Sequence, residues 1–276
     1  MYGAILGDII GEPYEFEQGP RSKDFPLFCE SPVFTDDSLM TIAICQGILE
    51  AGVDAGEDKM KESMIASMRR WGERHPYPAG GYGGGFARWL RSKNPEPYNS
   101  WGNGSAMRVA ATGWLFDTLE RTRQVSRWSA EVTHNHPEGI KGAESMASVI
   151  WMARNGSPKD KIKSFVESEF NYDLSRTCDQ IRPTYEFDPS CQGTVPEAIT
   201  AFIEGEDFED VIRTAVSLGG DCDTLTAIAG SIAEAYYGVP DAMKAEVARR
   251  LPGEFVEILM GISKIIELAI SANKLV

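Results

Sequence analysis

Hydrophobic positions along this chain recur mainly at steps of three and four residues, which is the spacing of helices that bury one face. The clearest stretch is 217–238, where a glycine turn and two aspartates precede a long amphipathic segment. Its apolar stripe consists of Leu225, Ile228, Ile232 and Tyr236. Small residues between these positions would let neighbouring helices approach closely, so we expect this helix near the centre of the fold.

The same spacing predicts helices over most of the chain, and strand-like alternation is scarce. The predicted helices are 3–11, 39–52, 57–74, 86–90, 109–119, 122–133, 138–155, 158–168, 193–204, 208–218, 241–250 and 254–272. Prolines or glycines without hydrophobic periodicity predict loops at 18–34, 76–85 and 170–195. Glycines recur every four residues in the first helix, which places them on one face and permits close packing. We therefore predict an all-α fold in which residues 1–276 form a single compact helical domain with functional residues in its loops.

Two of the predicted helices open with the same order of side chains. Residues 37–43 and 223–229 both contain an acid, a hydroxyl, Leu, two variable positions, Ile and Ala. An acidic residue at a helix N-terminus is often only a cap, because its carboxylate accepts free backbone N–H groups and complements the helix dipole. One cap needs only one carboxylate, whereas these two starts together supply four, along with two threonine hydroxyls. The residues concerned are Thr35, Asp36, Asp37, Asp221, Asp223 and Thr224.

An oxygen-rich cluster of this kind suits a hard divalent cation such as Mg²⁺, which takes a few carboxylates and keeps several waters. Four carboxylates brought together without a counter-charge would repel one another strongly, and bound cations remove that cost. Two divalent ions sharing such a site can activate water and stabilise developing negative charge. We therefore predict that the two helix starts form a metal site, with two unrelated helix caps as the alternative.

Composition narrows the classes of partner. The formal net charge is −14, so attraction to nucleic acid or to an anionic membrane would have the wrong sign. No stretch approaches the roughly 18 apolar residues of a membrane helix, and the apolar run 5–10 contains Asp8 and lacks the preceding basic residues of a signal peptide. The five cysteines are scattered and form no C-x-x-C pair, which indicates reduced thiols. We expect a cytoplasmic protein with no membrane partner, and nucleic acid is disfavoured.

Glycine-rich segments and two histidines add further candidates. The segment 102–105 precedes a predicted helix, so its backbone N–H groups are candidates to receive a phosphate, with a plain loop and helix cap as the alternative. The loop 80–85 is a similar candidate, but it lacks the Gly-Lys-Ser/Thr ending of a nucleotide triphosphatase. Arg108 is expected to form a structural ion pair. His134 and His136 have no further residues in a zinc-ligand pattern, so His134 is instead a candidate substrate contact, or structural.

Five blocks of this sequence resemble the ADP-ribosylglycohydrolase family, which includes dinitrogenase-reductase-activating glycohydrolase. The blocks are Gly3-Ala4-Ile5-Leu6-Gly7-Asp8-Ile9-Ile10-Gly11 with Glu15, Thr35-Asp36-Asp37-Ser38, Gly102-Asn103-Gly104-Ser105-Ala106-Met107-Arg108, Thr133-His134, and Gly219-Gly220-Asp221-Cys222-Asp223-Thr224. They follow the family's order and cover most of the chain. The two acidic blocks, in this order and separation, are the specific part of the resemblance.

The resemblance implies an all-helical fold with two Mg²⁺ ions, or Mn²⁺, in a cleft. The implied metal ligands are Thr35, Asp36, Asp37, Asp221, Asp223 and Thr224. The implied substrate is an ADP-ribosyl group on a protein side chain or a small molecule. Its implied contacts are Gly102, Asn103, Gly104, Ser105, Met107 and His134.

The resemblance also implies hydrolysis at the anomeric carbon, which passes through an oxocarbenium-like state. The expected nucleophile is a water activated by the ions and held by a carboxylate. Asp37 and Asp223 are both candidates for that carboxylate, whereas Glu15 would handle the leaving group or gate the site. Two alternatives use the same fold: a two-metal phosphoesterase, which would leave the glycosidic bond intact, and a non-catalytic ADP-ribose-binding protein. These motifs do not specify the leaving group, so arginine, serine and other linkages all stay open.

Overall fold

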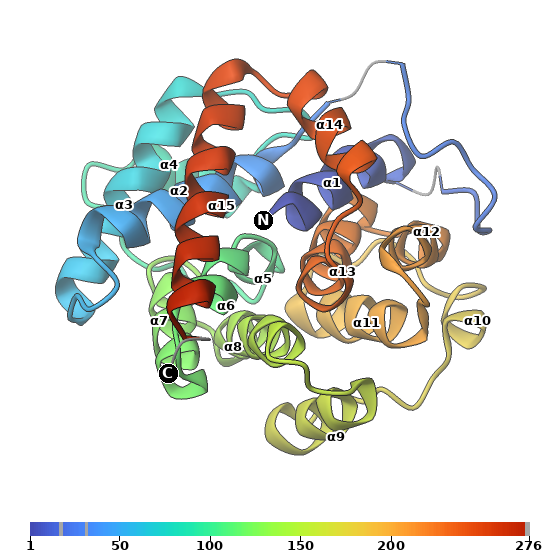
Figure 1. The fold of residues 1–276 in the computed structure, drawn as a ribbon. Helices are drawn as coiled ribbons and strands as arrows, with labels where there is room; N and C mark the ends of the chain where they lie inside the picture. Colours follow the sequence, from blue (N-terminus) through green and yellow to red (C-terminus); the bar gives the residue numbers. More distant parts are fainter. Residues whose placement is uncertain (17–18, 31–32, 274–276) are drawn as a thin grey trace.

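Helices joined by loops make up the computed structural model, which describes residues 1–16, 19–30 and 33–273, with side chains through residue 266 (Figure 1). The first half contains α1 (Tyr2–Gly11), the short 3-10 helix η1 (Glu12–Tyr14), α2 (Asp36–Ala51), α3 (Glu57–Arg74), α4 (Gly84–Arg91), α5 (Gly104–Met107), α6 (Ala110–Leu115) and α7 (Leu119–Glu131). The second half contains α8 (Pro137–Arg154), α9 (Lys159–Phe170), α10 (Cys178–Ile181), α11 (Cys191–Glu204), α12 (Phe208–Leu218), α13 (Cys222–Tyr237), α14 (Asp241–Arg250) and α15 (Gly253–Asn273). Within the described residues the only strand-type pairings are two isolated bridges. The all-α prediction is confirmed.

Helix α13 lies inside the molecule and contacts α1, α8, α11 and α12. Every residue from 222 to 233 is buried, as the small residues of this segment predict. Glycines of α1 bring the two backbones together: a Cβ placed on Gly7 would lie 2.2 Å from the Thr226 carbonyl oxygen, and one on Gly3 would lie 2.1 Å from that of Gly230. The four-residue spacing of the α1 glycines therefore exists because this face packs directly on α13.

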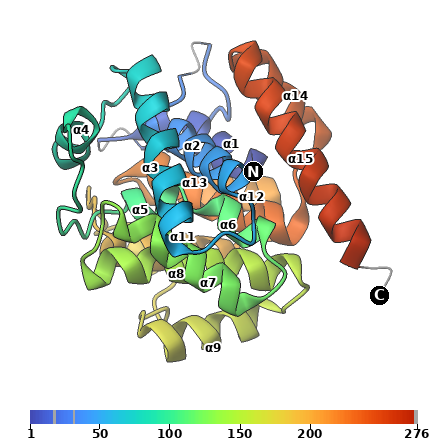
Figure 2. The ribbon, with the colours of Figure 1, turned by 90° about the vertical axis from the view of Figure 1, so that its left-hand side faces the viewer.

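The remaining helices complete one hydrophobic core. Helices α14 and α15 lie on one side of it (Figure 2), where α15 contacts α2 and α6. Among the described residues, none of the helices is both long and apolar enough to cross a membrane. All five cysteines are free, in agreement with the expected reduced thiols.

Most predicted helices are present, the short helices η1 and α5 were not predicted, and two longer regions differ. The predicted helix 109–119 is interrupted, because the chain becomes extended at Phe116 and α7 begins at residue 119. Thr118 starts α7 by accepting a hydrogen bond from the Arg121 N–H, with an N···O distance of 3.2 Å. The prediction of an irregular segment at 170–195 was wrong in part, since α10 and the start of α11 lie within it.

Helix caps explain why helices form within the segment 170–195. Thr177 and Gln180 form a reciprocal capping box at α10, and the Ser190 side chain accepts the Gly193 N–H at the start of α11 (3.0 Å). The described part of the predicted loop 18–34 contains no helix before residue 36. Residues 18, 31 and 32 of that prediction lie outside the described residues.

Candidate metal centre and substrate cavity

Loops and helix starts from distant parts of the chain surround a cavity of about 420 Å³. Two backbone bridges help to build its wall. Thr35 pairs with Ala79, which places the glycine-rich loop beside the start of α2, and Gly102 pairs with Ser190 at the start of α11. All the predicted site residues line this cavity except Thr35 and Ser105.

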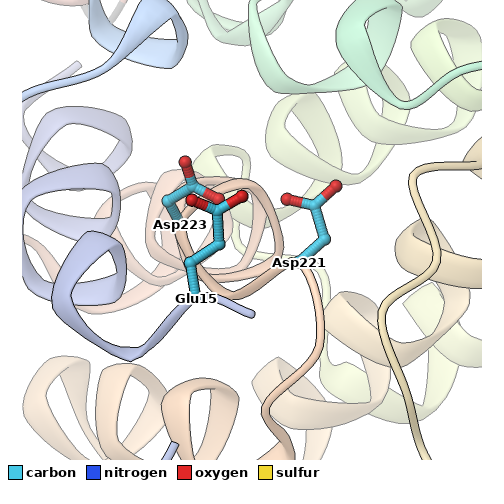
Figure 3. Close-up of side chains that lie close together, drawn as sticks. All are labelled: Glu15, Asp221 and Asp223. Atoms are coloured by element: carbon cyan, nitrogen blue, oxygen red, sulfur yellow. The ribbon is translucent and has the colours of Figure 1, made fainter. Parts of the chain in front are cut away.

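Three carboxylates gather over the start of α13, as Figure 3 shows. Glu15, Asp221 and Asp223 are all buried, and each places one oxygen within 4.8 Å of the others, so the three together could hold a metal ion. Glu15 follows η1 in an extended conformation, whereas the two aspartates come from the opening turn of α13. The structure therefore groups Glu15 with two of the predicted metal ligands, although the sequence suggested only a role in catalysis or gating.

A glycine turn aims Asp221 into the cavity. Gly219 and Gly220 have φ angles of 78° and 75°, in the left-handed region that favours glycine. Asp221 occupies the N-cap position of α13, but its side chain makes no cap hydrogen bond. It accepts instead from Asn103 Nδ2 at 2.7 Å. The capping interpretation of Asp221 is therefore wrong, and Asn103, predicted as a substrate contact, also orients this carboxylate.

The start of α2 meets the start of α13 through Asp37. Thr35 caps α2 by accepting the Asp37 N–H at 3.1 Å, and the Thr224 hydroxyl lies 3.2 Å from Asp37 Oδ2. The other carboxylate oxygen of Asp37, Oδ1, is buried and has no hydrogen-bond partner. Asp36 is half-buried and also lines the cavity. The two acidic helix starts thus lie against each other, with one carboxylate oxygen unsatisfied.

Asp8 of α1 holds the start of α2, and the sequence analysis assigned it no role. Its fully buried carboxylate accepts the Thr35 N–H (3.0 Å) and hydroxyl (2.9 Å), the Ser38 N–H (3.1 Å) and the Ser38 hydroxyl. Burial raises the pKa of Asp8 to about 6. An acid inside the otherwise apolar run 5–10 was the signal that could have revealed it, because a buried carboxylate needs partners.

The surroundings of the site carboxylates disfavour their ionised form and so raise their pKa values. Burial, followed by repulsion from Asp221, raises the pKa of Glu15 to about 7. Burial and the neighbouring Asp8 raise the pKa of Asp36 to about 8. The pKa values of Asp37 and Asp223 are also well above the usual range, first because of burial and then because of nearby carboxylates. A bound divalent cation would relieve this repulsion, so these oxygen donors, including the orphaned Asp37 Oδ1, fit a metal.

His134, which also lines the cavity, belongs to a buried chain of polar side chains. The Thr133 hydroxyl lies 2.7 Å from His134 Nδ1, and Arg108 donates to the Thr133 hydroxyl (2.7 Å) and the Ser129 carbonyl (2.8 Å). The expected ion pair of Arg108 is therefore wrong in its partner, since its guanidinium donates to neutral oxygens in a buried setting. Burial lowers the pKa of His134 well below its usual value, so the imidazole is neutral.

His136 has a different structural role from His134. Its Nδ1 accepts the Glu138 N–H at 3.1 Å and caps α8.

Some side chains of the segment 102–107 line the cavity, and others lie in the core. Met107 lines the cavity, whereas the Ser105 hydroxyl points into the core and donates to the Gly139 carbonyl at 2.7 Å. Four backbone N–H groups of the segment are engaged within the protein: Gly102 with the Ser100 hydroxyl (3.1 Å), Asn103 with the Pro189 carbonyl (2.8 Å), and Ala106 and Met107 with the Asn103 carbonyl (2.8 and 3.0 Å). A phosphate would therefore have to use other N–H groups of this segment.

Two aromatic residues that the sequence analysis missed also line the cavity. Phe16 and Phe187 stack with ring centroids 5.2 Å apart and are 56% and 41% exposed. Phe16 directly follows Glu15, and its φ of 54° is unusual for a residue with a side chain. Nothing in the local pattern indicated that positions so distant in sequence would pair.

Comparison with known proteins finds similarity to ADP-ribosylglycohydrolases at the level of both sequence and structure. The sequence model described as ADP-ribosylglycohydrolase matches residues 1–272. The chain is 26% identical to human ADP-ribosylhydrolase ARH3 over 87% of its length and 84% of the relative. It is also 26% identical to the ADP-ribosylarginine hydrolase Tri1 of Pseudomonas putida, over 87% of this chain and 70% of the relative. A solved structure of an ADP-ribosylglycohydrolase-related protein complex superposes with a TM-score of 0.72 at 22% identity, covering 96% of this chain and 95% of that one, which shows a shared fold.

Proposed function

This chain belongs to the ADP-ribosylglycohydrolase family, and from that membership we propose that it is a divalent-metal-dependent hydrolase that cleaves the glycosidic bond between ADP-ribose and a modified target. The observation that carries the proposal is the meeting of two acidic helix starts and Glu15 in one cavity. The cavity of about 420 Å³ is of the size that holds a small organic ligand. The family consists of hydrolases, so a purely binding role is disfavoured.

Two Mg²⁺ ions, or Mn²⁺, are the proposed cofactors. The proposed ligands are Thr35, Asp36, Asp37, Asp221, Asp223 and Thr224, joined by Glu15, whose carboxylate lies close to those of Asp221 and Asp223. The fit is supported by the orphaned Asp37 oxygen and by the raised pKa values of these acids. Such ions supply Lewis-acid chemistry that activates water at neutral pH and stabilises developing charge.

The residues of the chain supply the remaining steps. The bond to the anomeric carbon breaks with positive charge building on the sugar ring, and the surrounding carboxylates stabilise that charge. Asp37 or Asp223 accepts the proton of the attacking water, since each has a carboxylate at the cavity wall. Glu15 reaches the same cluster from η1 and acts on the leaving-group side or at the entrance. Asn103 and His134, which also line the cavity, are proposed to contact the ADP-ribosyl group.

Several leaving groups suit this proposal. The name of Tri1 makes ADP-ribosyl-arginine one candidate, and ADP-ribosyl-serine and small ADP-ribosyl compounds are others. The free cysteines fit a reducing compartment, so we propose that the protein acts in the cytoplasm.

The test is release of free ADP-ribose from ADP-ribosyl-arginine and ADP-ribosyl-serine peptides, followed by mass spectrometry with Mg²⁺ or with EDTA. We expect release from at least one peptide that EDTA abolishes and that Asp223→Asn removes. Asp241→Asn is the matched control, because the Asp241 side chain is 98% exposed at the start of α14. Release of AMP with the glycosidic bond intact would identify a phosphoesterase instead. Turnover that persists in EDTA, or in Asp223→Asn, would refute the assigned site.

A further inference from the structure

Arg21 fastens together two segments that flank the carboxylate cluster. It lies in the loop after Glu15, and its Nη1 donates to the carbonyl oxygens of Tyr185 (2.8 Å), Arg182 (3.1 Å) and Leu218. Leu218 is the last residue of α12, and Arg182 directly follows α10. The guanidinium thus pairs with carbonyls at the C-termini of α12 and of the four-residue α10, and the dipole of α12 also favours a cation there.

Arg21 also packs against the turn that aims Asp221. A Cβ placed on Gly219 would lie 2.9 Å from Arg21 Cζ, and a Cβ on Gly19 would lie 3.4 Å from the Gly219 Cα. Gly219 and Gly220 lead directly into Asp221. The φ of Arg21 is 51°, which is unfavourable for a residue with a Cβ. Its backbone is therefore held in an uncommon conformation at the point where the loop meets the glycine turn.

We propose that Arg21 is a positioning residue of the metal site. It holds residues 19–21 against the turn that precedes Asp221, so that the Asp221 carboxylate lies within reach of a cation that Glu15 also reaches. The inference rests on the proposed function, because it requires the cluster to bind a divalent ion. Residues that orient metal ligands without touching the metal typically contribute about 10–100-fold to metal affinity.

The same loop offers a matched control. Arg213 of α12 donates from Nη1 to the carbonyl oxygens of Lys23 (3.0 Å) and Phe25 (2.8 Å), and from Nε to Glu209 (2.7 Å). Loss of Arg213 would therefore loosen the loop while leaving the contacts of Arg21 with the glycine turn in place. A general effect of loop anchoring and a specific effect on the metal site can be separated in this way.

The experiment measures Mn²⁺ affinity by isothermal titration calorimetry, together with the melting temperature in EDTA, for the full chain and its variants. We expect Arg21→Ala to weaken Mn²⁺ binding about 10–100-fold, while Arg213→Ala lowers the melting temperature and keeps Mn²⁺ affinity close to that of the unmodified protein. Arg21→Gln is the second variant, because its shorter neutral side chain removes the charge and the reach to the carbonyls.

Unchanged Mn²⁺ affinity in folded Arg21→Ala would overturn the inference, as would an equal loss of affinity in Arg213→Ala. If Arg21→Ala gives no cooperative melt, Arg21→Gln decides by the same criterion. Failure of the unmodified protein to bind Mn²⁺ would instead refute the proposed metal-dependent function, so the two failures are distinguishable.

Discussion

At the scale of single residues, Asp37 is a site residue whose surroundings lower the stability of the fold. Its Oδ1 is buried without a partner, and nearby carboxylates add to the burial that raises its pKa. A buried charge without a counter-charge is unfavourable, and sites built for ligands often carry such a cost. The ionised form is therefore destabilising until a cation is bound.

We expect Asp37→Asn to raise the melting temperature in EDTA at pH 8, because it removes one negative charge from the cluster. The same variant should lose most of the increase that we expect Mg²⁺ to give the unmodified protein. Differential scanning fluorimetry in EDTA and in MgCl₂ measures both effects. A lower melting temperature than the unmodified protein in EDTA would show that Asp37 serves mainly as a structural hydrogen-bond partner.

Substitution of Asp8 should lower the stability of the fold, because the Asp8 carboxylate is fully hydrogen-bonded. Asp8→Asn would turn an NH₂ group toward donors of Thr35 or Ser38 and leave them unpaired. We expect a loss of about 1–3 kcal/mol of unfolding free energy, measured by urea denaturation in EDTA. The exposed control Asp241→Asn should change little. A loss in the control as large as that in Asp8→Asn would contradict this account.

These residues also show what a sequence can reveal. The sequence could predict that the two acidic helix starts supply candidate site residues, because local sequence marks where a helix begins. These residues are Asp36, Asp37, Asp221 and Asp223. Asp8, Arg21 and the Phe16–Phe187 pair were not predictable, because their partners lie far along the chain. Whether a buried acid caps, orients a neighbour or faces a cavity depends on those distant partners.

At the scale of elements, the pairing of α1 with α13 determines where the carboxylate cluster lies. The glycines of α1 allow its backbone to touch α13, and this contact brings Asp8 and the chain leading to Glu15 beside the start of α13. The periodicity of apolar residues predicted both helices and the close packing of the glycine face. It did not predict α10 or the break after α6, where Thr177 and Thr118 caps outweigh weak hydrophobic patterns.

Gly7→Ala tests this pairing. The new Cβ would lie 2.2 Å from the Thr226 carbonyl oxygen and 2.5 Å from the Ala227 Cα, which are backbone atoms that cannot rotate away. We expect a loss of about 1–3 kcal/mol or more in unfolding free energy, as for other overpacked cores. Gly261→Ala in α15 is the control, since no atom lies within 4 Å of its new Cβ. There the better helix propensity of alanine should add roughly 0.5–1 kcal/mol. Equal effects would argue against close α1–α13 contact.

At the scale of the whole molecule, stability, pH and metal binding are linked through the buried acids. The folded state raises the pKa of Glu15 to about 7 and that of Asp36 to about 8, from ordinary values of 4.5 and 3.8. The folded protein therefore binds more protons than the unfolded chain across roughly pH 4 to 8. Because stability falls with rising pH wherever the folded state holds more protons, the metal-free protein is destabilised progressively through that window.

We expect the melting temperature in EDTA to fall between pH 5 and pH 8, by an amount on the order of a few °C. Saturating Mg²⁺ should raise the melting temperature more at pH 8 than at pH 5, since protons compete with the cation for the same carboxylates. Fluorimetry over this pH range, with and without Mg²⁺, measures both effects. The net charge of −14 contributes a general repulsion, so Asp37→Asn and Asp241→Asn, which remove one charge each, serve as a pair. If both variants weaken the pH dependence equally, general repulsion rather than the carboxylate cluster causes it; a weaker dependence in Asp37→Asn alone locates the linkage in the site.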